Sequence, residues 1–199
     1  MMLTLFHAPQ SRSSRFIWLL EELAADYTIR YVGIPRRDGS GAADPANPHP
    51  DRKVPALNHD GALVTESAAI ALYLTDLYPE SGVGPIVGSA GRAAYLTWLA
   101  YYAGVIEPVV TIHSAGLADN ADLSRAFRGV KEMNGRVRDA LDRGPFLLGD
   151  DFSAADLLLG SLGHFARGML PAGDPVDRWL SGLSARPAFA RALAKDGPV

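Results

Sequence analysis

A turn-rich stretch, "PESGVGP" at residues 79–85, divides the chain into two parts with different hydrophobic periods. Before it, two short β-prone runs, "LTLFH" (3–7) and "YTIRYV" (27–32), flank a segment whose apolar residues recur at helical spacing: Phe16, Leu19, Leu20 and Leu23. After it, apolar residues follow the helical period throughout and no strand is needed. We therefore predict a small α/β domain at 1–78, a linker at 79–88 and an all-helical domain at 89–199.

The first domain is expected to continue beyond this βαβ unit. Residues 33–50 are rich in Gly, Pro and Asp and have no period, which predicts a long loop with one irregular helical turn. Two apolar runs around Asp60–Gly61 predict a β-hairpin, and a second helix follows from Ser67 and stops before Pro79. The expected fold is α+β, with the element order βαβαββα in the first domain.

The second domain is expected to contain helices marked by four sets of apolar residues: Tyr95, Trp98, Leu99 and Tyr102; Phe127, Val130, Val137 and Leu141; Leu158, Leu162 and Phe165; Val176, Trp179, Leu180 and Leu183. Pro108 should kink or break the first of these helices.

The composition of the chain limits its chemistry. It has no cysteine, which excludes disulfides, thiolate metal sites and a protein thiol as nucleophile. Its net charge of -3 gives no electrostatic case for binding nucleic acid. No window approaches the roughly 18 apolar residues of a membrane span. We therefore expect a cytoplasmic protein with no metal, no nucleic-acid partner and no membrane partner.

The loop "HAPQSRSS" (7–14) places three serines directly before the first predicted helix: Ser11, Ser13 and Ser14. A helix N-terminus carries unpaired N–H groups and a partial positive charge, so it stabilises an anion in front of it. One serine could simply be the N-cap, or a hydroxyl could donate a hydrogen bond to such an anion. This stretch alone leaves both interpretations open.

Two further segments could bind an extended ligand. In "KVPAL" (53–57), Pro55 either begins a strand or follows a cis bond that turns the Val54 backbone outward to pair with a peptide. In "TESAAI" (65–70), Ser67 either caps a helix or, with the free amides of that helix, holds a carboxylate. Glu66 beside it could take an ammonium group, so the pair would suit an α-amino acid headgroup.

A fourth motif concerns folding. In "FLLGDDFSAADLLLG" (146–160), Ser153 followed by Asp156 predicts a capping box, which we interpret as structural. The serine-rich loop, Val-Pro, Glu-Ser and Ser-x-x-Asp, in this order, closely resemble the glutathione S-transferase superfamily, of the bacterial type with a serine-type active site. The resemblance covers the whole chain. It implies a thioredoxin-like N-terminal domain followed by an all-α domain.

The resemblance also implies a glutathione site formed by two segments: Arg52, Lys53, Val54, Pro55, Glu66 and Ser67. Val54, ahead of a cis-proline, would pair with the cysteinyl unit of glutathione. Glu66 and Ser67 would hold the γ-glutamyl headgroup, and the two basic residues would contact the glycine carboxylate.

The group implied to activate the thiol is Ser11, with Ser13 as the alternative and Arg12 adding positive potential. Cysteine-type members of the superfamily have a cysteine where Arg12 stands, and tyrosine-type members have a tyrosine where Phe6 and His7 stand. The serine would donate a hydrogen bond to the sulfur and would act neither as a base nor as a nucleophile.

The function implied is a glutathione transferase that uses glutathione as co-substrate to conjugate small hydrophobic electrophiles or to reduce peroxides. The resemblance further implies a cytoplasmic, detoxifying homodimer. The electrophile is expected between the domains, beside Tyr101, Tyr102 and Val105. Two alternatives stay open, a non-catalytic interaction protein of the same fold and a glutathione-dependent isomerase.

Overall fold

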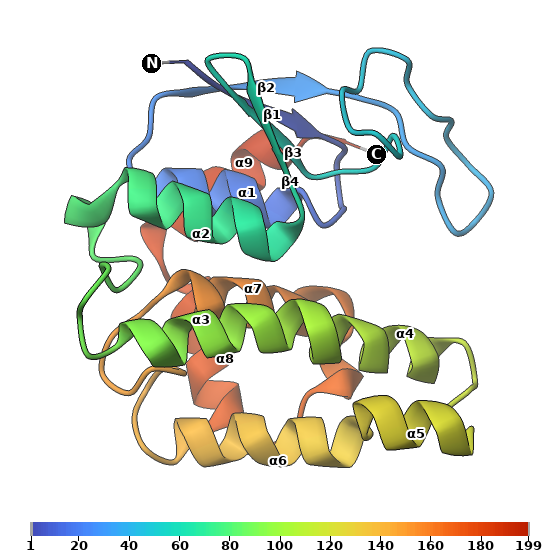
Figure 1. Ribbon diagram of the computed structural model, residues 1–199, viewed down its shortest axis with the longest axis vertical. Helices are drawn as coiled ribbons and strands as arrows, with labels where there is room; N and C mark the ends of the chain where they lie inside the picture. The colour runs from blue at the N-terminus through green and yellow to red at the C-terminus, as the bar shows by residue number, and fades with distance from the viewer. Residues whose placement is uncertain (1, 199) are drawn as a thin grey trace. The chain divides into compact units, whose positions relative to one another are not determined.

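Four strands form one mixed sheet in the computed structural model, which describes residues 2–198 (Figure 1). The order across the sheet is β2-β1-β3-β4. The strand bounds are β1 (Leu3–His7), β2 (Tyr27–Tyr31), β3 (Ala56–His59) and β4 (Ala62–Thr65). β1 is parallel to β2 and antiparallel to β3, and helix α1 (Ser14–Glu22) makes the crossover that a parallel pair needs. The predicted βαβ unit and hairpin are both present.

The register of the strands brings three loops to one end of the sheet. Phe6 of β1 pairs with Ala56 of β3, and Ala56 in turn pairs with Thr65 of β4. The loop after β1, the loop before β3 and the turn after β4 therefore all leave the sheet at the same end. The three segments that the sequence marked for ligand binding are these loops.

Helices α1, α2 (Ser67–Leu77) and α9 (Pro187–Asp196) lie beneath the sheet in Figure 1. α1 and α9 pack closely: the rings of Trp18 and Phe189 meet edge to face with their centroids 4.9 Å apart. Beside them, the guanidinium of Arg186 donates to both carboxylate oxygens of Glu22, at 2.6 and 2.8 Å. The last helix is thus fixed to the first by apolar and charged contacts together.

The chain folds as two units, and the last helix belongs to the unit that contains the sheet. The first unit runs to Ser81 and resumes at Arg186, and the second comprises Gly82–Ala185. The sequence-based division kept everything from residue 89 to the C-terminus in one helical domain, so the structure differs from it in α9. Hydrophobic periodicity identifies a helix but does not identify its packing partner.

Residues 32–55, between β2 and β3, contain no helix, although the expected order βαβαββα placed one there. This part of the described chain consists of turns and extended segments. Its prolines, Pro35, Pro45, Pro48 and Pro50, lack the N–H that a helix interior requires. The thioredoxin-like sheet and the helical second part of the predicted fold are confirmed.

The second unit is built from helices. They are α3 (Arg92–Tyr101), the π-helical segment η2 (Tyr102–Ile106), α4 (Glu107–Ser114), α5 (Ala121–Phe127), α6 (Val130–Leu141), α7 (Ala154–Phe165) and α8 (Val176–Ser184). Two short 3-10 helices, η1 (Pro79–Ser81) in the first unit and η3 (Arg167–Met169) in the second, complete the order. Among residues 2–198, no helix is both long and apolar enough to cross a bilayer.

Two of the predicted helices are interrupted, each for a local reason. Pro108 donates no hydrogen bond to the preceding turn. The N–H of Glu107 instead bonds to the carbonyl of Tyr102, five residues back, which creates the π-helical segment. The helix expected through Phe127 and Leu141 is two helices, because Arg128 takes a φ of 63° that no α-helix accommodates.

The predicted capping box is present at the start of α7. The buried carboxylate of Asp156 accepts hydrogen bonds from the N–H of Ser153 at 3.0 Å, the N–H of Leu147 at 2.8 Å and the indole N–H of Trp179 at 3.0 Å. It therefore joins the helix start, the preceding turn and α8. Burial raises the pKa of Asp156 to about 6, against the opposing effect of these donors.

This shift predicts a pH dependence of stability. The folded-state pKa of Asp156 lies above its unfolded value, so protonation favours the folded state, and that contribution is lost as the pH rises from about 4 through about 6. As the pH rises over this range, the free energy of unfolding of the wild-type protein should fall by about 3 kcal/mol relative to that of Asp156→Asn. Urea unfolding at several pH values measures it. A difference that grows with pH would contradict the raised pKa.

Candidate active site

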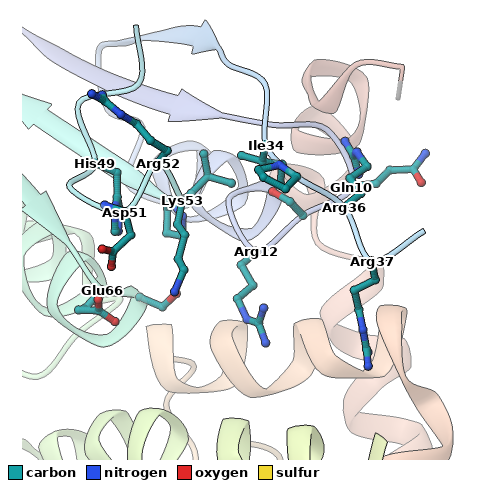
Figure 2. Close-up of a pocket in the computed structure, with 15 residues that line it drawn as sticks. Gln10, Arg12, Ile34, Arg36, Arg37, His49, Asp51, Arg52, Lys53 and Glu66 are labelled. Atoms are coloured by element: carbon teal, nitrogen blue, oxygen red, sulfur yellow. The ribbon is translucent and has the colours of Figure 1, made fainter. Parts of the chain in front are cut away.

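A cavity of about 650 Å³ opens at the end of the sheet where the three loops meet, and all its lining residues belong to the first unit (Figure 2). Its volume is typical of small-ligand sites. Residues from every predicted segment of the first unit line it: Ser11, Arg12, Arg52, Lys53, Val54, Pro55, Glu66 and Ser67. The fold therefore brings together residues that are up to 56 positions apart in the sequence.

The two candidate serines have different positions. Ser11 is half-buried and lines the cavity, whereas Ser13 is fully buried at the N-cap position of α1. Their Oγ atoms are 2.7 Å apart, and the Ser11 hydroxyl also donates to the carbonyl of Ala8 at 2.7 Å. Ser13 makes no capping hydrogen bond to α1. Of the two hydroxyls, only that of Ser11 is placed to meet a ligand.

The buried serine is bound from behind by the last residue of β1. The Nδ1 atom of His7 is 2.8 Å from Ser13 Oγ, and the Nε2 atom of His7 is 2.9 Å from the carbonyl oxygen of Asp196 in α9. The ring is fully buried. Burial lowers the pKa of His7 below its usual value, and the contacts with Asp196 oppose this only partly.

The Val54–Pro55 peptide bond is cis, as the resemblance implied. The side chain of Val54 packs against the small apolar cluster of Phe6, Val32 and Ala56. Among residues 2–198, neither the backbone N–H nor the C=O of Val54 has a hydrogen-bond partner. Val54 lines the cavity, so its two unpaired backbone groups are candidates for pairing with an extended ligand.

The start of α2 supplies the third part of the cavity. Glu66, with a φ of 68°, occupies the N-cap position, and Ser67 is the first helical residue rather than the cap. The N–H groups of its first turn lack helical partners, and the Glu66 side chain makes no capping hydrogen bond to them. An exposed carboxylate, a hydroxyl and free amides are therefore adjacent, a combination that complements an ammonium and a carboxylate on one carbon.

Basic side chains dominate the rest of the lining, and they differ in how they are held. The guanidinium of Arg52 donates to the carbonyls of Asn47 and Pro45 and is thereby bound within its own loop. Arg36 donates to the carbonyl of Pro9 at 2.8 Å. Figure 2 shows the side chains of Arg12 and Arg37 extended in the same direction from different loops.

Several lining residues were not foreseen: Gln10, Ile34, Pro35, Arg36, Arg37, His49 and Asp51. Most come from the long loop before β3, whose sequence has no period. A run of prolines and charged residues predicts only that a loop is present. Its approach to the end of β1 is a tertiary contact that no local pattern records.

This loop is fixed by one buried side chain. Asn47 is completely buried, its amide group donates to the carbonyl of Lys53 at 3.0 Å, and its side-chain oxygen accepts from the N–H of His49 at 3.0 Å. Asn47 thus joins the two ends of the segment that carries Arg52 and Lys53. The presentation of Val54 at the cavity depends on it.

The residues expected to contact an electrophile lie in the second unit. Tyr101 is half-buried, and the guanidinium of Arg136 lies over its ring at 3.9 Å from the centroid. Tyr102 is buried, with its hydroxyl donating to Glu107, and Val105 follows in the same π-helical segment. Their contact with an electrophile stays a prediction.

A thioredoxin-like sheet with a cis-proline loop, a helix start beside it and a separate helical unit defines the glutathione S-transferase class of fold. Residues 5–82 match the family model of the glutathione S-transferase N-terminal domain. Glutathione S-transferase 3 of Schizosaccharomyces pombe is 28% identical over 218 residues, which span 98% of this chain and 88% of that protein.

Solved structures of glutathione transferases have a similar fold. A glutathione transferase from Methylococcus capsulatus superposes with a TM-score of 0.81 at 29% identity, over 99% of this chain and 100% of that one. A sphingomonad glutathione S-transferase complexed with glutathione gives 0.77 at 27% identity, over 98% and 100% of the two chains. Residues 5–82 thus match the glutathione S-transferase N-terminal domain family, and the chain as a whole has the fold of these transferases.

Removing the Asn47 side chain should loosen the loop at the cavity. Asn47→Ala removes the partners of the Lys53 carbonyl and the buried His49 N–H, which costs about 1–3 kcal/mol and raises the open population of the loop about tenfold. Limited trypsin digestion should then cleave after Arg52 and Lys53 about tenfold faster, relative to cleavage after Arg36 and Arg37. Asn58→Ala, in the β3–β4 hairpin, is the matched control. Equal acceleration at both pairs of sites would show that Asn47 has no local role.

Proposed function

We propose that this protein is a glutathione transferase that binds glutathione in the cavity of the first unit, activates its thiol and transfers it to small hydrophobic electrophiles. The observation that carries the proposal is the meeting of the Ser11 hydroxyl, the open Val54 backbone and the uncapped start of α2 at one cavity. The sphingomonad relative, complexed with glutathione, supports the choice of ligand.

We expect glutathione to bind in the orientation that matches its charged groups to the lining of the cavity. Its γ-glutamyl carboxylate would lie at the N–H groups and hydroxyl of Ser67, with its ammonium at Glu66. The cysteinyl unit would pair with the N–H and C=O of Val54, as an added strand pairs with a sheet edge. Lys53 is the better partner for the glycine carboxylate, because the guanidinium of Arg52 already donates to carbonyls of its own loop.

This orientation brings the thiol to Ser11 and the N-terminus of α1. A free thiol with a pKa near 8.5 is only a few per cent ionised at neutral pH, and the thiolate is the nucleophile. A hydrogen bond from Ser11, the helix N-terminus and the positive charge of Arg12 favour the anion. Lowering the pKa by two units corresponds to about 2.7 kcal/mol of differential stabilisation.

The same proposal includes the electrophile at Tyr101, Tyr102 and Val105, a cytoplasmic location and a homodimer. Peroxide reduction by the activated thiol uses the same residues, because it also begins with attack by the thiolate. Ser13 is not part of the cavity lining, and we therefore assign the contact with sulfur to Ser11.

Calorimetric titration with glutathione tests the binding. The wild-type protein should bind at or below millimolar ligand. Ser67→Ala should weaken the affinity about tenfold or more, because it removes a hydrogen bond to a charged group. Ser89→Ala, an exposed serine of the second unit, is the control and should bind like wild type. No heat of binding at millimolar glutathione would reject the proposed function.

Ser11→Ala tests the activation of the thiol. Loss of a hydrogen bond to an anion should raise the pKa of bound glutathione by about one to two pH units and reduce turnover, with little change in affinity. The ultraviolet absorbance of the thiolate, titrated against pH at saturating glutathione, measures this pKa. Ser11→Thr retains a hydroxyl and should restore most of the shift. A thiol titration unchanged in Ser11→Ala would reject this role.

A further inference from the structure

A continuous chain of hydrogen-bonding groups leads from the cavity into the core of the first unit. It runs from Ser11 Oγ to Ser13 Oγ over 2.7 Å, then to Nδ1 of His7 over 2.8 Å. On the far side of the ring, Nε2 lies 2.9 Å from the carbonyl oxygen of Asp196. Ser11 lines the cavity, whereas Ser13 and His7 are fully buried.

The partners fix the direction of these hydrogen bonds. A carbonyl oxygen only accepts, so Nε2 of His7 carries the proton, and in the neutral ring Nδ1 is then an acceptor. Ser13 therefore donates its single hydroxyl proton to Nδ1, while its oxygen accepts from the N–H of Ala8 at 3.1 Å. The Ser11 proton can lie toward Ser13 or toward the carbonyl of Ala8, which the Ser13 hydroxyl also approaches, at 3.2 Å.

We propose that His7 is the acceptor of the thiol proton of glutathione, reached through Ser11 and Ser13. The inference rests on the proposed function of the cavity. The S–H bond breaks and its proton moves to Ser11 Oγ, the Ser11 proton moves to Ser13 Oγ, and the Ser13 proton forms the new bond to Nδ1 of His7. The products are a thiolate that accepts a hydrogen bond from Ser11 and an imidazolium, with both serines again neutral.

The surroundings of His7 suit both protonation states. Burial lowers its pKa, so the resting ring is neutral and able to accept. Asp196 Oδ1 lies 3.4 Å from Nε2, is buried, and has no hydrogen-bond partner among residues 2–198. Its other oxygen accepts from the N–H of Gln10 at 3.0 Å. A carboxylate oxygen is thus already positioned to stabilise the imidazolium.

The other groups packed around the ring do not compete for this proton. Tyr31 of β2 meets His7 edge to face at 5.5 Å, and its hydroxyl donates to the carbonyl of Lys195 at 2.8 Å. The ammonium of Lys195 donates to the carboxylate of Glu21 and lies over the ring of Tyr27. Asp196 is therefore the charged partner that His7 would meet on protonation.

The test counts protons released when glutathione binds. Calorimetry at neutral pH in buffers of different ionisation enthalpy gives the protons released, and ultraviolet absorbance gives the thiolate formed. If His7 keeps the proton, the wild-type protein should release close to zero protons per thiolate. His7→Asn can still accept the hydrogen bond of Ser13 but cannot be protonated. It should release about one proton per thiolate and form about tenfold less thiolate at this pH.

Two further variants complete the test. His59→Asn is the matched control: this histidine ends β3, opposite Leu3 at the other end of β1, and its Nδ1 lies 2.6 Å from the hydroxyl of Tyr73. It should behave like wild type. Asp196→Asn retains His7 but removes the counter-charge, so it should release an intermediate number of protons per thiolate. It serves as the deciding variant if circular dichroism shows that His7→Asn does not fold.

The outcomes separate the two proposals. The role of His7 would be overturned if the wild-type protein released about one proton per thiolate. It would also be overturned if Asp196→Asn released the same number of protons per thiolate as the wild-type protein. Either result would leave the transferase function intact. Absence of glutathione binding would overturn both.

Discussion

The buried imidazole of His7 connects three parts of the first unit: the end of β1, the start of α1 and the last turn of α9. Its two nitrogen atoms contact Ser13 and the backbone of Asp196 at 2.8 and 2.9 Å. Because the ring is excluded from water, each nitrogen needs a protein partner. The position of the serine loop therefore depends on a residue that the cavity does not expose.

The cavity combines this rigid background with groups that are left open. The Glu66 side chain does not cap the α2 N-terminus, and the Val54 backbone has no hydrogen-bond partner among residues 2–198. Such groups are unfavourable when buried, and they remain tolerable here because water or a ligand can reach them. Asn47 and Arg52, by contrast, use their polar atoms to hold the loop together. Binding groups and supporting groups are thus different residues of one short segment.

The sequence predicted many of the residues that line this cavity, because they lie in short motifs. A serine-rich loop before a helix, a Val-Pro before a strand and a Glu-Ser before a second helix are local signals, and all three reach the cavity. The contribution of Arg36, Arg37 and His49 could not be foreseen, since their loop has neither period nor motif. The resemblance favoured Ser11 and left Ser13 as the alternative, and the structure distinguishes the two serines by the burial of Ser13. The contact between His7 and Asp196 spans 189 positions, far beyond any local pattern.

The discontinuity of the first unit has a consequence for biosynthesis. The sheet, α1 and α2 leave the ribosome early, while α9 emerges only after the whole of the second unit has been made. Until then Trp18 lacks the ring of Phe189, Glu22 lacks Arg186, and the imidazole at the end of β1 lacks its carbonyl acceptor. The nascent protein therefore lacks part of the support of its ligand pocket until α9 has been made.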